Sequence, residues 1–285
     1  MNRMWSNLCK ALEQQGAMLM SILHSQGSAP RHAGAQMVLL EDGGQWGTIG
    51  GGKIEAVCLV HAAKLLAEKQ SDTQTYNLSD AGENSIGMSC GGQVTVEFRY
   101  LPMGNQSVEW VTQMVEKLPV GRVLIFGAGH VSQALAALLP ALELDYIVVD
   151  DRPEFAKEEL FPAARQVLCC PMQGAVEKLS PKPEDLMVVV TRGHAHDYEV
   201  VCQALNSPVE YIGLMGSRRK VALMQKRWLE DGFTTQQLER ISTPIGLDIG
   251  AETPAEIAIS IAAQLIQVQA QRRPKGGWAK HLIHS

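Results

Sequence analysis

Residues 123–139 constrain the fold of this chain more than any other segment. The apolar run Val-Leu-Ile-Phe at 123–126 predicts a buried strand, and residues 130–139 have the composition of a helix. Between them stands Gly127-Ala128-Gly129, the glycine turn that a dinucleotide-binding βαβ unit requires. We therefore expect a parallel α/β domain around this segment.

The next apolar run supports that interpretation. Residues 146–149 read Tyr-Ile-Val-Val and end in Asp150 and Asp151, about 20 positions after the glycines, where an acid binds a ribose hydroxyl in such units. The amides around Gly127 and Gly129 would then hold a phosphate at the helix N-terminus, with Asp150 on a ribose. A tight strand–helix turn without a ligand is the alternative.

Composition narrows the class of protein. A length of 285 residues favours two domains, and the net charge of −5 argues against a general nucleic-acid binder. The sequence has no apolar run of about 18 residues and begins with a polar stretch, so we expect a cytoplasmic protein that does not act at a membrane. The six scattered cysteines form no C-x-x-C pair and predict free thiols.

The first half predicts a smaller α/β domain. Helices are expected over residues 2–15 and 53–68, and strands over 17–23, 36–40, 46–49 and 93–100, with a hairpin turn at residues 42–44. Residues 93–100 alternate apolar and polar side chains, which is typical of a half-buried strand. We expect this domain to cover residues 1–104.

The second half alternates strands and helices, as a doubly wound parallel sheet demands. Strands are expected over residues 123–126, 146–149, 166–169, 186–190 and 211–215, and a capping box at residues 253–256 predicts the start of the last helix. This domain should span residues 105–271, followed by a flexible basic tail over 272–285.

Two expected loops follow strands of this sheet and should meet at one cleft, since ligands of open α/β sheets bind beyond the carboxyl ends of the strands. Residues 191–197 contain His194, His196 and Asp197, which offer a metal site or a plain surface loop as alternatives. Residues 216–220 contain Ser217 and Arg218 beside further cations, a composition that suits phosphate but also a solvated turn.

Two glycine-rich stretches of the first half carry further candidates. Gly50, Gly51 and Gly52 precede a helix and could form an anion-binding nest, although a hairpin exit explains them nearly as well. Cys90 lies between glycines near free amides, a setting that favours a reactive thiolate, whereas most isolated cysteines are inert.

Seven short motifs then follow one another over nearly the whole chain: GSAPR at 27–31, GTIGGG at 47–52 with Glu55, GMSCGG at 87–92, FGAGHV at 126–131, DDR at 150–152 with Phe155, YIGLMGSRRK at 211–220, and PIGLDIGAETPAE at 244–256. Their order resembles the XdhC/CoxI family, the accessory proteins of xanthine dehydrogenase and related molybdenum hydroxylases. Ser132 departs from the glycine that is common at its position.

The resemblance implies a chaperone and not an enzyme. Such proteins bind the molybdenum cofactor, a molybdopterin, protect it while its sulfido ligand is installed, and deliver it to an apo-molybdenum hydroxylase such as xanthine dehydrogenase. It implies a cysteine desulfurase as sulfur donor, and Cys90 as the cofactor-linked cysteine and contact to molybdenum. The residues expected to bind the cofactor are Cys90, Gly91, Gly92, Gly50, Gly51, Gly52, Gly127, Gly129, His130, Asp150, His194, Ser217 and Arg218.

Two further expectations remain open. An NAD-dependent oxidoreductase would explain the nucleotide-binding half, but it leaves Cys90 and the first domain without a role. A homodimer is expected because two-fold dimers are the commonest soluble oligomers.

Overall fold

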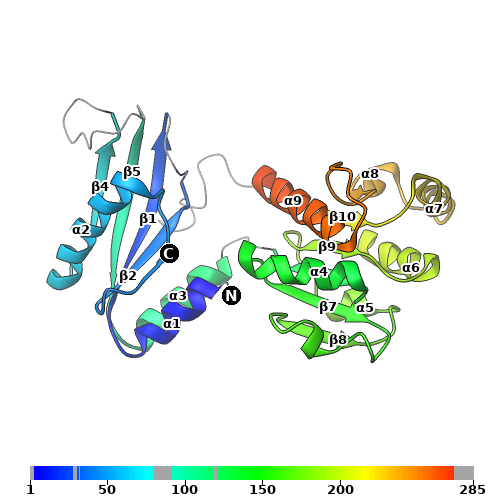
Figure 1. The fold of residues 1–285 in the computed structure, drawn as a ribbon, viewed down its shortest axis with the longest axis horizontal. Helices are drawn as coiled ribbons and strands as arrows, with labels where there is room; N and C mark the ends of the chain where they lie inside the picture. Colours follow the sequence, from blue (N-terminus) through cyan, green and yellow to red (C-terminus); the bar gives the residue numbers. More distant parts are fainter. Residues whose placement is uncertain (1–2, 28–30, 32, 80–91, 118–120, 273–285) are drawn as a thin grey trace. The chain divides into compact units, whose positions relative to one another are not determined.

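A computed structural model of the chain describes residues 3–27, 31, 33–79, 92–117 and 121–272. These residues form two compact units, 3–117 and 121–272 (Figure 1). Helix α3 (Asn105–Lys117) packs against α1 (Arg3–Leu12) and so belongs to the first unit. The structure therefore divides one helix later than position 104, to which the sequence assigns the boundary.

The first unit is an antiparallel sheet of five strands in the order β3-β2-β1-β5-β4. Helix α2 (Gly52–Glu68) packs on one face, while α1 and α3 pack on the other. The strands are β1 (Ala17–Gln26), β2 (Gln36–Leu40), β3 (Gln45–Gly47), β4 (Asp72–Asn77) and β5 (Gln93–Leu101).

Local sequence explains most of these elements. In β5, Val94, Val96 and Phe98 are buried and the residues between them are partly buried, which confirms the predicted alternation over residues 93–98; Tyr100 is only partly buried. The hairpin between β2 and β3 is also confirmed, and its turn contains Gly43 at φ +84°. Strand β4 is not among the predicted elements, because it is an edge strand whose only apolar residue is Tyr76.

The second unit is a parallel sheet of six strands in the order β11-β10-β9-β6-β7-β8, which confirms the expected Rossmann-like architecture. The strands are β6 (Val123–Phe126), β7 (Tyr146–Asp150), β8 (Gln166–Cys169), β9 (Leu186–Val189), β10 (Tyr211–Leu214) and β11 (Ile241–Ser242). The helices are α4 (His130–Leu138), α5 (Ala175–Lys178), α6 (His194–Leu205), α7 (Arg218–Glu230), α8 (Thr235–Leu238) and α9 (Pro254–Arg272), with short 3-10 turns η1 (Leu139–Leu142) and η2 (Glu158–Leu160).

Helices cover both faces of this sheet and so create two cores. Helices α4 and α9 pack on one face, and α5, α6 and α7 pack on the other. All residues of β6 and β9 are buried, because a central strand of a parallel sheet is covered on both sides. That burial explains why these strands read as continuous apolar runs.

The predicted capping box of the last helix is confirmed. The Glu256 amide donates to Thr253 Oγ1 at 3.3 Å, and the Thr253 amide donates to Glu256 Oε2 at 2.9 Å. Pro254 takes the first helical position, where its missing N–H costs nothing.

Strand order reverses between β6 and β9, the two central strands. The chain passes from β6 to β7 on one side of this point and from β9 to β10 on the other. In open α/β sheets the ligand crevice lies at this reversal, beyond the carboxyl ends of the strands. Among the helices that the structure describes, none combines the length and the apolar content that a membrane span needs.

Candidate functional site

The turn after β6 requires a glycine at its first position only. Gly127 has φ +106°, and a Cβ built there would lie 2.4 Å from the carbonyl oxygen of Val190, at the end of β9. Gly129 has φ −72°, and a Cβ there would meet nothing within 4 Å. The fold therefore explains Gly127 and leaves Gly129 unexplained.

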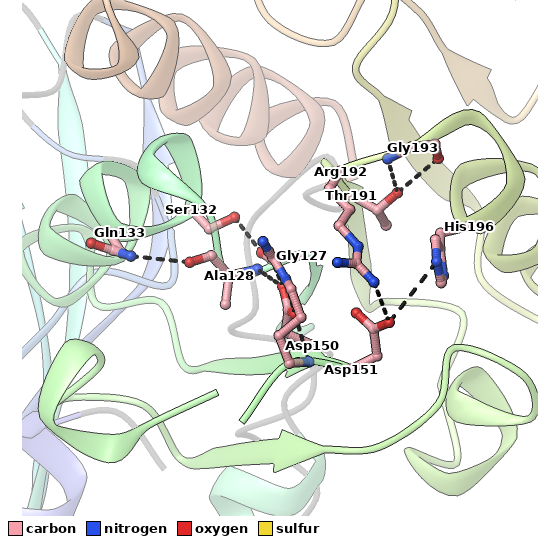
Figure 2. Close-up of polar contacts among 11 residues, drawn as sticks. Gly127, Ala128, Ser132, Gln133, Asp150, Asp151, Thr191, Arg192, Gly193 and His196 are labelled. Carbon is pink, nitrogen blue, oxygen red and sulfur yellow. Dashed lines mark hydrogen bonds and ion pairs between the residues drawn. The ribbon is translucent and has the colours of Figure 1, made fainter. Parts of the chain in front are cut away.

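Side chains of the same unit form hydrogen bonds with this turn (Figure 2). Ser132 donates from its hydroxyl to the Gly127 carbonyl, and Gln133 Nε2 donates to the Ala128 carbonyl at 3.1 Å. Ser132 is buried, and its hydroxyl gives the turn a hydrogen-bond partner within the unit.

Asp150, the residue expected to bind a ribose, is an internal ligand of this turn. Its carboxylate accepts the Ala128 amide at 2.7 Å, the Arg152 amide at 3.0 Å, and Nε and Nη2 of Arg152 at 2.9 Å each. Burial raises the pKa of Asp150, but the hydrogen bonds from Arg152 and Ala128 outweigh it and hold the pKa below its usual value. With only 1% of Asp150 exposed, a ribose hydroxyl would have to displace these donors.

Asp151, the second of the two acids at the end of β7, does not bind the glycine turn and contacts residues around the start of α6 instead. Its Oδ2 accepts Nη2 of Arg192 at 3.1 Å and lies 3.9 Å from Nε2 of His196, so the end of β7 meets the start of α6 (Figure 2). The side chain of Arg192 is 53% exposed. The sequence pattern places Asp151 at this strand end, but it carries no signal for Arg192 beyond its position in the loop that follows β9.

Residues 194–197, expected as part of a loop, form the first turn of α6. The helix begins after Gly193, which has φ −159° and open space at its Cβ position, and it has no side-chain cap. Helix α4 likewise begins after a glycine, Gly129, with no side-chain cap. Two helices flanking the strand reversal thus begin at glycines that the fold does not require, where Ser, Thr, Asp or Asn would be the usual residues.

The start of α7 is closed to an outside anion in two ways. Ser217, a predicted cofactor contact, caps the helix by accepting the Lys220 amide at 3.3 Å. The Lys220 ammonium pairs with Asp197, whose side chain is 2% exposed and also accepts the Thr191 hydroxyl at 2.6 Å. The side chains of His194 and Arg218 lie outside the described part of the structure.

The glycine nest of the first unit is occupied by the chain's own carboxylate. Glu55 Oε2 accepts the Ile49 amide at 3.2 Å, the Gly51 amide at 3.1 Å and the Thr48 hydroxyl at 2.5 Å. Burial would raise the pKa of Glu55, but the bonds from Thr48 and from the amides of the loop hold it below its usual value. Gly50, Gly51 and Gly52, all at positive φ, thus enclose an internal anion and not an open site.

The remaining candidates are placed as follows. His130 is the exposed first residue of α4. Gly92 is buried, and its carbonyl accepts the Leu78 amide at 2.8 Å. Cys90 and Gly91 lie outside the described residues. Within the described ranges, no three His, Cys, Asp or Glu side chains are grouped to hold a metal ion.

Comparison with known proteins identifies this architecture. The model of the XdhC Rossmann domain matches residues 123–265, half of the chain, and the model of the XdhC and CoxI family matches residues 11–77. The chain belongs to the XdhC and CoxI family. The resemblance seen in the sequence motifs is thereby confirmed.

Three relatives are similar over 90% of this chain. YqeB of Escherichia coli, named an uncharacterized protein, is 33% identical, and the match spans only 45% of its length. A Bacillus subtilis protein named as a probable xanthine dehydrogenase subunit is 26% identical, with 94% of its length matched. The molybdenum cofactor insertion chaperone PaoD of E. coli is 23% identical with 84% matched.

A solved structure shares the fold. A Bacillus halodurans protein described as a xanthine dehydrogenase has a TM-score of 0.76 to this chain at 23% identity. The match covers 96% of this chain and 98% of that one.

Proposed function

We propose that this protein is an accessory chaperone that binds the molybdenum cofactor and delivers it to an apo-molybdenum hydroxylase of the xanthine dehydrogenase type. Family membership and the names of two relatives support this proposal, since one is called a molybdenum cofactor insertion chaperone and the other is named for xanthine dehydrogenase. A cysteine desulfurase would supply the sulfur, and turnover of a substrate is not part of the role.

One structural observation suggests where the cofactor would bind. Gly129 and Gly193 start α4 and α6 on either side of the strand reversal, with ordinary φ values and open space where a Cβ would stand. A side chain at either position would cover the free amides of the first helical turn. Glycine keeps those amides, and the positive end of each helix dipole, open to an approaching anion.

The anionic end of the cofactor fits this edge of the sheet. A pterin cofactor of this kind carries a phosphate, and helix N-termini with a nearby guanidinium suit phosphate oxygens. Arg192 is half-exposed and held beside the site by Asp151, so it can turn from one anion to another. We assign the phosphate to the amides after Gly129 and Gly193, with Arg192 as the cation.

The metal end needs a different residue. Molybdenum coordinated by sulfur is best matched by a soft thiolate, and the described residues contain no cluster of metal ligands. Cys90, in the segment Gly-Met-Ser-Cys-Gly-Gly at 87–92, is our candidate for that contact. When bound, the cofactor supplies the molybdenum chemistry of the enzyme that finally receives it; this chain holds and orients it.

The test measures cofactor content in protein expressed with an intact cofactor pathway. Gly129→Ser and Gly193→Ser should each fold, because Ser is a better N-cap than Gly by a few tenths of a kcal/mol. Each should lose about 10-fold or more of the pterin recovered by oxidation and fluorescence, since a tenfold loss needs only about 1.4 kcal/mol. Ala222→Ser, at an exposed position on α7, is the matched control and should retain it.

Two further measurements complete the test. Cys90→Ala should lose pterin, and the wild-type protein loaded with cofactor should activate an apo-xanthine dehydrogenase. Full pterin retention in the Gly129→Ser/Gly193→Ser variant would refute the assigned site. Absence of pterin from the wild type, together with binding of NADH and hydride transfer to a substrate, would favour the oxidoreductase instead.

A further inference from the structure

The first unit contains a pocket lined by residues that none of the seven sequence motifs includes. It has a volume of about 600 Å³, within the range of small-molecule sites, and it lies between strand β5 and helix α3. Glu97 and Arg99 line it from the face of β5 that carries Leu101, which packs beneath α3. Ser107 and Trp110, about one turn apart on α3, form the facing wall.

The pocket exists because helices cover only part of this sheet face. Apolar residues of β1, β2 and β5 pack beneath α1 and α3, whereas no described residue of β4 contributes to that core. Beside it, Thr73 of β4 pairs with Glu97 of β5. This corner of the sheet is therefore polar, and α3 borders it on one side.

The floor of the pocket is an ion pair that keeps hydrogen-bonding groups to spare. Nη2 of Arg99 donates to Glu97 Oε1 at 2.9 Å, and the guanidinium lies over the Trp110 ring, 4.6 Å from its centroid. The side chains of Arg99 and Glu97 are only 26% and 19% exposed, yet this is the one side-chain hydrogen bond that either makes to a described residue. A guanidinium has five N–H donors and a carboxylate has two acceptor oxygens, so both residues can bind a ligand without separating.

Ser107 gives a second, independent indication of a ligand. It is 5% exposed and lines the pocket, but its hydroxyl has no hydrogen-bond partner among the residues that the structure describes. A buried hydroxyl without a partner costs free energy, which a ligand bonded to it would recover. Ser107 also lies in the first turn of α3, where free amides and the helix dipole attract an anion.

The charges of the pocket favour a ligand that carries both signs. Arg99, Ser107 and the start of α3 suit an anionic group, while the second oxygen of Glu97 suits a cationic one. A simple anion would lie beside the Glu97 carboxylate and a simple cation beside the Arg99 guanidinium, so each would meet a like charge. Because Arg99 and Glu97 are in contact, the two charges of the ligand must also be close together, as they are in an α-amino acid.

We propose that this pocket binds a free α-amino acid. The carboxylate of the ligand accepts hydrogen bonds from Arg99 and Ser107, and its ammonium donates to Glu97. An apolar side chain of the ligand lies against Trp110 and Leu101, the apolar residues of the wall and floor. This inference does not rest on the proposed function, since it uses none of the residues assigned to the cofactor.

The first experiment titrates the full-length protein with L-phenylalanine in an isothermal titration calorimeter. We expect saturable binding with a dissociation constant below about 1 mM. N-acetyl-L-phenylalanine lacks the ammonium and L-phenylalaninamide lacks the carboxylate, so each should bind about 10-fold more weakly or worse. Equal affinity for either derivative, or no binding below about 1 mM by any standard L-α-amino acid, would overturn the proposal.

The second experiment repeats the titration with charge variants. Arg99→Gln and Glu97→Gln should each weaken the binding of L-phenylalanine by about 10-fold or more, because each removes the partner of one ligand charge. The matched controls, Lys64→Gln and Glu68→Gln, each remove one member of an exposed ion pair on α2 and should bind like the wild type. Wild-type affinity in both pocket variants would overturn the assigned site. The derivative titrations use the wild type, so they test the proposal even if a charge variant does not fold.

Ser107→Ala separates a ligand contact from a structural role. It should weaken binding by about 3-fold or more. Its melting temperature by circular dichroism should not fall, because the hydroxyl has no described partner to lose in the free protein. A lower melting temperature with unchanged affinity would show that Ser107 serves the fold, and it would remove this residue from the site.

Discussion

Asp150 and Asp151 are neighbours in sequence, yet the structure predicts opposite consequences for their replacement. In Asp150→Asn, the carboxylate that accepts four hydrogen bonds becomes an amide that can accept on one side only. Its NH₂ group must then face either the Ala128 amide or the Arg152 guanidinium, so donor meets donor. The turn that follows β6 therefore loses part of the Asp150 clamp, the set of hydrogen bonds that this carboxylate accepts from Ala128 and Arg152.

The loss can be estimated from the exposure of the two partners. The Arg152 side chain is 18% exposed and can recover part of its hydration, but Ala128 is fully buried and its amide cannot. A buried donor without a partner costs about 1–3 kcal/mol, and a charge-assisted bond contributes about 1.5–3 kcal/mol. We expect Asp150→Asn to destabilise the second unit by about 3 kcal/mol, which for a unit of this size lowers its melting temperature by about 6–12 °C.

Asp151→Asn is the matched control. The side chain of Asp151 is 22% exposed and pairs with an Arg192 that is 53% exposed, so the pair contributes about 0–1 kcal/mol. Differential scanning calorimetry, with hydrogen exchange of peptides spanning residues 123–135, should show a large change for Asp150→Asn and a small one for Asp151→Asn. Equal melting temperatures for Asp150→Asn and the wild type would refute the clamp, and an unfolded Asp151→Asn would refute the contrast.

The effect should also depend on pH with a definite sign. The pKa of Asp150 is lowered in the folded protein from its ordinary value of 3.8. A carboxyl with a depressed folded-state pKa stabilises the protein above its unfolded value, and this stabilisation is lost as the pH falls through the folded-state pKa. The difference between the wild type and Asp150→Asn should therefore be full at pH 7 and should shrink below about pH 4.

Three other substitutions test the remaining interactions. Gly127→Ala should destabilise the second unit by more than about 2 kcal/mol in thermal unfolding, because its φ is +106° and its Cβ would collide with the Val190 carbonyl. Gly129→Ala should be nearly neutral, and equal effects of the two substitutions would contradict the geometry. Glu55→Gln should lower the free energy of unfolding of the first unit by about 1 kcal/mol in urea denaturation at pH 7 and by less at pH 3, since the pKa of Glu55 is lowered. A difference that does not change with pH would contradict a charged Glu55 carboxylate in this loop. Lys220→Met should lower the free energy of unfolding by about 3 kcal/mol, because it leaves Asp197 charged and buried. Lys220→Met/Asp197→Asn should recover part of this stability, and no recovery would show that the loss of the ion pair is not the cause.

Sequence patterns predicted the second unit better than the first. Its central strands are buried on both faces, so each is a continuous apolar run that can be read directly. Strand β4 in the first unit lies at a sheet edge with the sequence Asp-Thr-Gln-Thr-Tyr-Asn, and its pairing with β5 comes from tertiary contact. The place of α3 in the first unit likewise depends on packing against α1, which its own amphipathic sequence does not specify.

The candidate site shows a sharper limit of sequence reasoning. The sequence places two acids at the end of β7, but only the backbone decides that Asp150 turns inward to the glycine turn and Asp151 toward Arg192. Similarly, the three glycines at 50–52 have the pattern of an anion nest, and Glu55 one helical turn later proves to be the anion. In both cases the structure shows a hydrogen-bond partner within the chain, and the expected binding of an outside ligand stays a prediction.

The internal bonding of the turn after β6 has a consequence for how a ligand would leave. Asp150, Ser132 and Gln133 satisfy polar groups of that turn without any bound molecule. The turn is therefore preorganised, and neither arrival nor departure of a ligand needs a stretch of backbone to order or melt. If the protein carries the cofactor as proposed, this turn stores little strain that could expel it. Under that proposal, transfer would follow the difference in affinity between the two proteins, and an acceptor that binds more tightly would take up the cofactor by competition alone.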